Sequence, residues 1–329
     1  MAYENTTEVL SEDSSKKVQT IIKRYKEAEA LKDNWKDKFE EAYEYCLPQR
    51  ESFYEESAGQ KRTDKIFDET AVVGIQEFAS RLQSGIVPTF ARWADLKAGI
   101  EIPENDTEQV NASLDAITQY VFEVISNSNF NSEVHESFMD LAVGTGVLLV
   151  EEGDAVNPIR FSSIPLPHVC LMNGPTNKID AVYRKRQCKL SEIEVMYPKA
   201  KVPEYIMSTM NPEKKCTILD AVYRVYDEPN VEKHKHCVVL MDKKEIILEE
   251  IFEGVGSNPY VCFRWNKASG EVYGRGPIFN AMSAIKTTNL TIQLILENAQ
   301  MSISGIYQVE DDGIVNPDNI QLVPGSLIP

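Results

Sequence analysis

The residues of this sequence whose types and spacing come closest to a chemical site form a glycine-rich stretch, GEVYGRGP, at positions 270–277. Glycine-rich loops of this kind bind phosphate when they end in Gly-Lys-Ser/Thr and lead into a helix. No such ending is present, because Arg275 lies between Gly274 and Gly276 instead. We therefore interpret the stretch as a tight bend from a strand into a helix that begins at Pro277, with Arg275 paired to an acidic group of an adjacent subunit.

Metal chemistry is the second possibility that the sequence raises. His234, His236 and Cys237 have metal-binding side chains within one short segment. A tetrahedral site needs further ligands at a familiar spacing, and the chain offers no second His or Cys pair. A solvent-exposed hairpin is the favoured interpretation, and we predict no metal site.

Adjacent carboxylates raise the question of metal-dependent hydrolysis. They occur at Glu151 with Glu152 and at Asp311 with Asp312. Two-metal hydrolysis needs several carboxylates that converge on one cleft, whereas neighbours on a strand point to opposite faces. We interpret these residues as solvated edges, with Asp311 and Asp312 in a turn that faces a partner, and we predict no catalytic residue and no cofactor.

The elements around the glycine-rich stretch are a short strand and a long helix. Residues 260–265 are aromatic and β-branched, as in a buried strand, and proline is favoured at the first position of a helix. From Pro277 to about Ser304 apolar residues recur at helical spacing, and only Lys286 and Glu297 are charged. A helix of this length spans roughly 42 Å.

Such a polar but nearly uncharged helix is expected to pack against copies of itself or to line an aqueous passage. An ordinary buried helix of a large core is the alternative. The candidates for channel or inter-subunit contacts are Lys286, Asn289, Gln293 and Asn298.

The chain divides by composition into a helical part and a strand-rich part, which predicts an α+β fold. Residues 1–13 are polar and predicted to be disordered, and residues 14–145 carry helical periodicity. Residues 146–266 contain short β-branched runs between turn residues, which predicts an antiparallel β region packed on the helices. Residues 267–304 form the glycine loop and long helix, and residues 305–329 form a last segment.

Composition limits the possible partners. The 329 residues include 34 basic and 51 acidic side chains, for a net charge of −17, which argues against holding nucleic acid by phosphate neutralisation. Six cysteines are scattered without a CxxC pair, as expected for reduced thiols. No apolar run of 18 residues and no leader pattern is present, so we predict neither a membrane span nor a signal peptide.

The sequence resembles the head-to-tail connector, or portal, proteins of short-tailed bacteriophages. The resemblance follows the family's order over nearly the whole chain. It rests on the helix ending in Tyr45-Cys46-Leu47-Pro48, on IFDETAVVGIQEFASRLQSGIVPTFARWADL (66–96), on NFNSEVHESFMDLAVGTGVLLVEE (129–152), and on the NPY, GRGP and IKTTN motifs of residues 258–289.

This resemblance implies a structural, non-enzymatic protein of the virion. Its members form a ring, usually of twelve copies, at one capsid vertex, and double-stranded DNA passes through the ring during packaging and ejection. By the same resemblance residues 14–266 are a wing, the helix from Pro277 is the first stem helix, and residues 305–329 begin a clip with Asp311 and Asp312. The second stem helix, channel loop and crown of the family have no counterpart before Pro329.

Partners expected from the resemblance are terminase, a tail adaptor, and the major capsid and scaffolding proteins, with assembly in the host cytoplasm. Two other classes remain open on the residues alone. One is a hydrolase that uses the glycine loop, and the other is an acidic monomeric adaptor without a channel.

Overall fold

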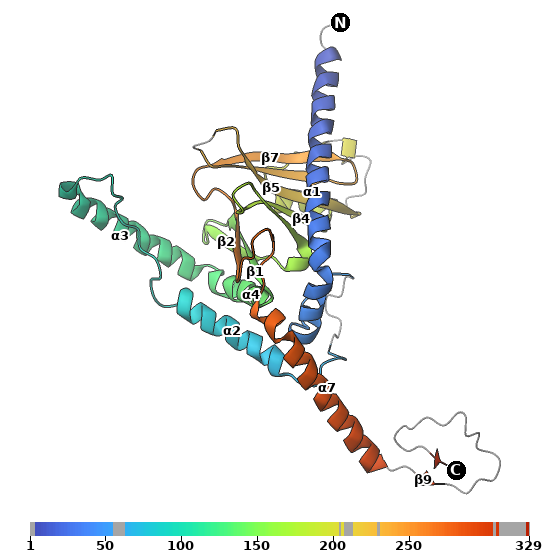
Figure 1. The fold of residues 1–329 in the computed structure, drawn as a ribbon. Helices are drawn as coiled ribbons and strands as arrows, with labels where there is room; N and C mark the ends of the chain where they lie inside the picture. The colour runs from blue at the N-terminus through green and yellow to red at the C-terminus, as the bar shows by residue number, and fades with distance from the viewer. Residues whose placement is uncertain are drawn as a thin grey trace.

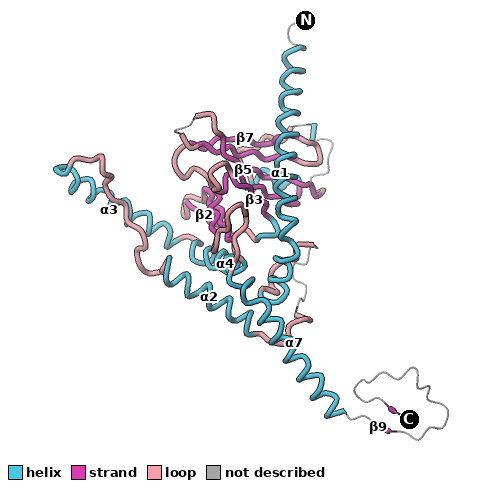
Figure 2. Tube along the Cα trace, viewed as in Figure 1, coloured by secondary structure: helices cyan, strands magenta, loops and turns pink. Residues whose placement is uncertain are grey.

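The computed structural model describes residues 4–54, 63–203, 205–206, 213–228, 231–304, 307–308 and 327–328, and Figures 1 and 2 show their arrangement. Helices come first in the chain, strands follow, and one long helix comes after the strands, so the predicted α+β class is confirmed. The helices are α1 (Glu4–Cys46), α2 (Thr70–Ile86), α3 (Glu104–Asn127), α4 (Phe130–Val143), α5 (Ile193–Met196) and α7 (Pro277–Ser304), with one-turn helices η1 (Leu166–His168) and η2 (Leu190–Glu192).

The strands form two antiparallel sheets. The smaller sheet has the order β2-β1-β8, and the larger sheet is a meander in the order β3-β4-β5-β6-β7. A separate short pair joins β9 (Tyr307–Gln308) to β10 (Leu327–Ile328). The strands of the two antiparallel sheets are β1 (Thr145–Glu152), β2 (Ile159–Ser163), β3 (Val169–Asn173), β4 (Ile179–Lys189), β5 (Lys215–Val225), β6 (Lys233–Leu240), β7 (Glu245–Glu253) and β8 (Tyr260–Arg264).

Helix α1 runs the length of the body and contributes to two cores (Figure 1). Its earlier turns place Val18, Ile21 and Tyr25 against the larger sheet. Its last turns place Phe39 and Tyr43 in the central core, which α2, α4, the smaller sheet and the start of α7 complete. One periodic apolar stripe thus joins the two parts of the molecule.

Helix α1 begins within the polar N-terminal segment. Its first residue is Glu4, inside the range 1–13 for which the sequence predicts disorder. Extending a helix costs far less than nucleating one, so the packed turns after Val18 allow the helix to continue into polar sequence.

Two parts of the chain project from this body (Figure 2). Helix α3 extends away on one side, and α7 extends on another side, away from the N-terminus. The prediction of a helix from Pro277 to about Ser304 is confirmed by the bounds of α7. Asp311 and Asp312 lie outside the described residues.

Candidate functional site at the glycine junction and helix α7

Helix α7 starts at a junction where two segments distant in sequence lie backbone against backbone. The Gly276 N–H donates to the Val143 carbonyl oxygen at 3.0 Å, and the Gly274 N–H donates to the Thr145 hydroxyl at 2.9 Å. The Trp265 N–H donates to the Gly144 carbonyl oxygen at 2.9 Å. The end of α4 and the start of β1 therefore fix the position from which α7 departs.

The glycines are required here by space. A Cβ atom on Gly276 would overlap the Ala142 carbonyl oxygen, and one on Gly274 would overlap the Gly144 carbonyl oxygen. Gly144 itself has φ of +148°, in the range that L side chains rarely adopt, and it ends α4. Close backbone approach thus explains why Gly144, Gly274 and Gly276 are glycines.

Arg275 has its partner within the same chain. Its guanidinium makes two hydrogen bonds to the Glu271 carboxylate, at 2.6 and 2.9 Å, and lies over the Trp35 ring at 5.5 Å. The sequence predicts a pairing with an acidic group of an adjacent subunit, and within one chain a carboxylate four residues away meets the guanidinium. Trp35 also contacts Phe279 of α7, so α1 holds both the junction and the first turn of the helix.

The proximal half of α7, residues 277–289, is enclosed by the chain along one side, and its opposite edge is exposed. Asn289 is only 7% exposed, and its side-chain oxygen accepts the N–H groups of Phe67 (2.7 Å) and Asp68 (3.1 Å). Its side-chain nitrogen donates to the Lys65 carbonyl oxygen at 2.6 Å. Lys286 pairs with Glu41 of α1. Two residues predicted to meet a channel or a neighbour therefore have intrachain partners, which the sequence did not reveal.

The distal half of α7, residues 290–304, stands away from the body (Figure 1). Leu294 is 55% exposed and Leu296 is 53% exposed. Gln293 donates to Glu297 one turn later, and Asn298 is exposed. The two predicted residues of this half are therefore available to another molecule. The large apolar side chains exposed here are Leu290, Leu294, Ile295, Leu296, Met301 and Ile303.

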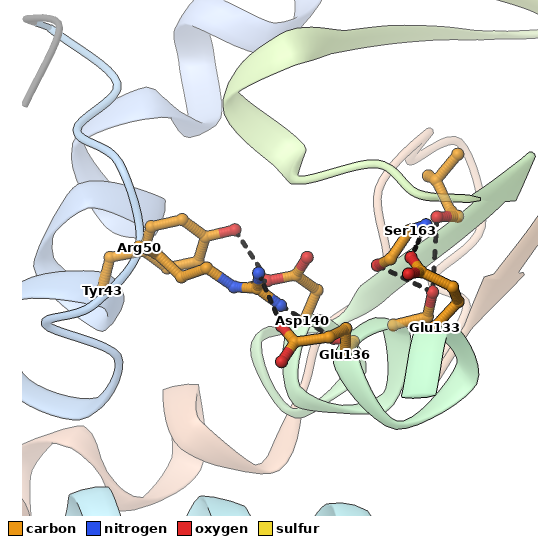
Figure 3. Close-up of polar contacts among 8 residues, drawn as sticks. Tyr43, Arg50, Glu133, Glu136, Asp140 and Ser163 are labelled. Atoms are coloured by element: carbon orange, nitrogen blue, oxygen red, sulfur yellow. Dashed lines mark hydrogen bonds and ion pairs between the residues drawn. The ribbon is translucent and has the colours of Figure 1, made fainter. Parts of the chain in front are cut away.

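A buried polar cluster braces the far side of α4 (Figure 3). The Arg50 guanidinium lies 2.8 Å from the Glu136 carboxylate and 3.3 Å from that of Asp140, and the Tyr43 hydroxyl donates to Asp140 at 2.9 Å. Nearer the start of α4, the Glu133 carboxylate accepts the Ser163 N–H at 2.7 Å. The cluster fixes α1 and the smaller sheet to the helix that carries Gly144.

Burial decides the ionisation of this cluster. Complete burial raises the pKa of Asp140 to about 6, although Arg50 and the hydrogen bond from Tyr43 oppose that rise. Burial also raises the pKa of the Tyr43 hydroxyl well above its ordinary value. Sequence reasoning missed Arg50 and Asp140, because they lie 90 residues apart and neither belongs to a motif.

Asp220 forms a second buried cluster, which ties the two sheets together. Its carboxylate accepts hydrogen bonds from the Tyr197 hydroxyl at 3.0 Å, the Tyr260 hydroxyl at 3.2 Å and His236 at 2.9 Å. Burial alone would raise its pKa, but the bond and charge of His236 lower it overall. The pKa of His236 is raised, because Asp220 outweighs the effect of burial.

His236 therefore has a structural partner. His234 lies beside the Ser257 hydroxyl at 2.9 Å, and Cys237 contacts the Tyr223 hydroxyl. Within the described residues, no three His, Cys, Asp or Glu side chains are grouped closely enough to hold a metal ion. The solvent-exposed hairpin predicted for this segment differs from the structure, because His234 is 2% exposed and Cys237 is fully buried.

A cleft of about 830 Å³ opens between the two sheets beside Asp220. Glu151 and Glu152 both line it, together with Arg160 and Lys199. Glu151 lies opposite Arg160 in the β1–β2 ladder, and Lys199 pairs with Glu250 at 3.2 Å.

In the described part of the chain no helix combines the length and apolarity that a bilayer span requires.

Two comparisons with known proteins agree with one another. A family model described as bacteriophage head to tail connecting protein matches residues 18–329. The probable portal protein of Bordetella phage BPP-1 is 21% identical over 294 residues, which are 84% of this chain and 51% of that relative. The chain thus spans about half the length of the curated relative it matches.

Proposed function

Because the chain belongs to the bacteriophage head to tail connecting protein family, we propose that it is a non-enzymatic portal subunit, and that copies of it form a ring around a channel for double-stranded DNA. In this proposal residues 14–266 form the wing, α7 forms a stem, and residues 305–329 begin a clip where Asp311 and Asp312 meet a partner. The relative named as a probable portal protein supports the same role.

The observation that carries the proposal is the distribution of side chains on distal α7. At 3.6 residues per turn, its apolar residues fall on two faces roughly 180° apart. One face carries Leu290, Leu294 and Met301, and the other carries Ile292, Ile295, Leu296, Ala299 and Ile303. A helix with apolar residues on two opposite sides needs two neighbours.

Two opposite faces favour a ring over a dimer. A two-fold dimer buries one self-complementary patch, whereas head-to-tail contacts use two different surfaces and close into a ring when the rotation allows. In this chain of net charge −17, α7 carries only one Lys and one Glu, so copies meet with little charge repulsion along it.

The polar edges between these faces support an orientation in the ring. Met282 and Asn289 on the side toward the body are buried, and Gln293 lies on the continuation of that side. The opposite edge carries Asn298, and it is exposed along the helix. Since the body cannot occupy the channel, we place this uncharged edge toward the DNA, where it offers no basic group to grip phosphates. The edge consists of Asn280, Ala284, Thr287, Thr291, Asn298 and Ser302.

Electron microscopy of the purified protein tests the proposal directly. Rings with a central hole are expected, and light scattering should give a mass of many subunits. A particle of one subunit's mass at all concentrations would contradict it and favour the acidic adaptor. The number of copies, for which we propose twelve, is read from the same images.

Single substitutions test whether both apolar faces are used. Leu294→Asp on one face and Ile295→Asp on the other should each abolish rings, because each removes one of two different contacts. Asn298→Asp is the matched control on the polar edge and should leave rings intact. If only one face proves sensitive, a two-fold dimer or a cover by another segment of the protein is the better explanation.

The wider role follows from the family and is proposed with it. The assembled ring would be part of the virion at one capsid vertex, after assembly in the host cytoplasm beside the major capsid and scaffolding proteins. It would dock terminase during packaging and a tail adaptor afterwards, with ATP hydrolysis in terminase. Co-sedimentation of purified rings with terminase, with and without the Asp311→Ala and Asp312→Ala changes, tests the docking.

A further inference from the structure

Two cysteines lie opposite one another at the end of the β4–β5 ladder. Cys188 of β4 is the register partner of Cys216 of β5, and the two sulfur atoms are 3.9 Å apart. The Cys216 thiol also donates to the Cys188 carbonyl oxygen at 3.3 Å. Opposed residues of antiparallel strands have Cα atoms about 4.5–5.5 Å apart, which lies within the range that a disulfide spans.

This arrangement distinguishes the pair from the other cysteines of the chain. All six cysteines are described and reduced, and the sulfur contact between Cys188 and Cys216 is the one cysteine–cysteine contact among the described residues. Cys237, one strand away, contacts the Tyr223 hydroxyl instead. The remaining three are Cys46, Cys170 and Cys262.

The two cysteines also lie at the two ends of the segment that connects β4 to β5 outside the larger sheet. The chain leaves β4 after Lys189 and returns at Lys215, the last register pair of the ladder. Between them, Ile193 and Tyr197 pack in the same core cluster as the two cysteines. Tyr197 reaches Asp220 and helps to line the cleft between the sheets. A bond between the two sulfurs would close this connecting segment at its base.

We propose that Cys188 and Cys216 are a redox modification site, at which a small-molecule disulfide oxidises the two thiols to a cross-strand disulfide. The two cysteines form a disulfide in an oxidising environment and are free thiols in a reducing one. It acts within one subunit and is independent of the proposed ring.

The reaction proceeds by two thiol–disulfide exchanges. The Cys188 sulfur, as thiolate, attacks one sulfur of oxidised glutathione, which breaks that S–S bond and releases one glutathione thiolate to take up a proton. The Cys216 sulfur then loses its proton and attacks the Cys188 sulfur of the mixed disulfide, which releases the second glutathione. Two protein thiols lose two electrons and two protons, and one oxidised glutathione becomes two reduced molecules.

The burial of the two thiols and their raised pKa values should make the oxidation slow. Cys188 is 7% exposed and Cys216 is 2% exposed, so attack follows opening of the last ladder positions. Burial raises the pKa of Cys188 to about 12 and also raises that of Cys216. The thiolate is the reactive form, so the initial rate should rise as the pH is raised above neutral.

Oxidation of the folded protein with oxidised glutathione, followed by alkylation and peptide mass mapping, tests the site. A peptide pair joined through Cys188 and Cys216 is expected, with the other four cysteines alkylated, and dithiothreitol should reverse it. The closed loop should raise the melting temperature by roughly 5 °C relative to the reduced protein. Two results would overturn the proposal: joining only after denaturation in urea, or glutathione adducts that never resolve into a cross-link.

Matched variants distinguish oxidation of the Cys188–Cys216 pair from oxidation elsewhere in the protein. Cys188→Ala and Cys216→Ala should each abolish both the cross-link and the shift in melting temperature. Cys237→Ala, in a comparably buried strand position without a sulfur neighbour, should leave both in place. A shift that persists in Cys188→Ala would show that another reaction stabilises the oxidised protein, and the proposed site would be rejected.

Discussion

The two halves of α7 share a nearly uncharged composition and have different surroundings. Residues 277–289 are held by α1, by the 65–68 segment and by the glycine junction, whereas residues 290–304 extend beyond the body. Both halves carry polar, nearly uncharged side chains at helical spacing. The first half therefore belongs to the subunit's fold, and the second half is the part that another molecule can cover.

The largest effect is expected at the junction that starts the enclosed half. Gly276→Val should destabilise the protein by about 4 kcal/mol, because its side chain would overlap the backbone of Ala142 and Val143. Urea unfolding measures this loss. Gly74→Val in α2 is the matched control, since a Cβ there meets nothing within 4 Å. Equal stability of the two variants would show that the junction is not tightly packed.

Removal of the buried charge behind the junction should change how stability depends on pH. The folded pKa of Asp140, about 6, is above its ordinary value of 3.8, so the folded state holds the proton more tightly. The contribution of Asp140 to the free energy of unfolding is fully present below pH 3.8 and is lost as the pH rises through 6. The loss is roughly 3 kcal/mol at most. Asp140→Asn should remove this decline in urea unfolding between pH 4 and pH 7.

The control for that measurement uses a partner of the same cluster. Glu136→Gln changes a carboxylate that is 43% exposed and should keep the decline with pH. If Asp140→Asn keeps the wild-type slope, Asp140 titrates near its ordinary pKa and Arg50 outweighs burial.

Two asparagines of α7 compare the halves most directly. Asn289→Ala should cost about 2 kcal/mol, because two partly buried N–H groups and one carbonyl oxygen lose their partner. Asn298→Ala should change stability by less than about 0.5 kcal/mol, since the residue is exposed. Thermal unfolding of both variants provides the comparison. Equal losses would contradict the division of the helix into an enclosed half and an open half.

The smallest effect is expected for the charged pair between α7 and α1. Lys286→Met should cost less than about 1 kcal/mol, because both partners are partly exposed and solvent screens the pair. Glu297→Gln in the open half should cost nothing measurable. A loss of several kcal/mol for Lys286→Met, measured by urea unfolding, would mean that the pair is the main contact between the two helices.

The predictions from sequence succeeded where one segment decides its own structure. Pro277 after a glycine and an apolar repeat of helical period predicted both ends of α7. The surroundings of Arg275 were not predictable in the same way, because the Trp35 ring that its guanidinium contacts belongs to α1, far away in the sequence.

The candidate site was predictable only in part for the same reason. The motif around Gly274 and Gly276 indicated a tight bend, but its partner, the Ala142–Gly144 backbone, is at least 130 residues away. Asn289 and Asn298 are chemically identical and lie on one helix. The local sequence pattern does not predict that the 65–68 segment contacts Asn289 and not Asn298.

The sequence by itself determined the α+β class, the long helix, the glycine bend and the resemblance that identifies the family. These properties depend on backbone preferences and on periodic burial, which act over a few residues at a time. Only the tertiary structure decided that one half of α7 is enclosed and the other open, that Arg50 meets Asp140, and that Cys188 faces Cys216. Those pairings depend on which distant segments of the chain come into contact. These contacts are fixed only when the whole core is closely packed.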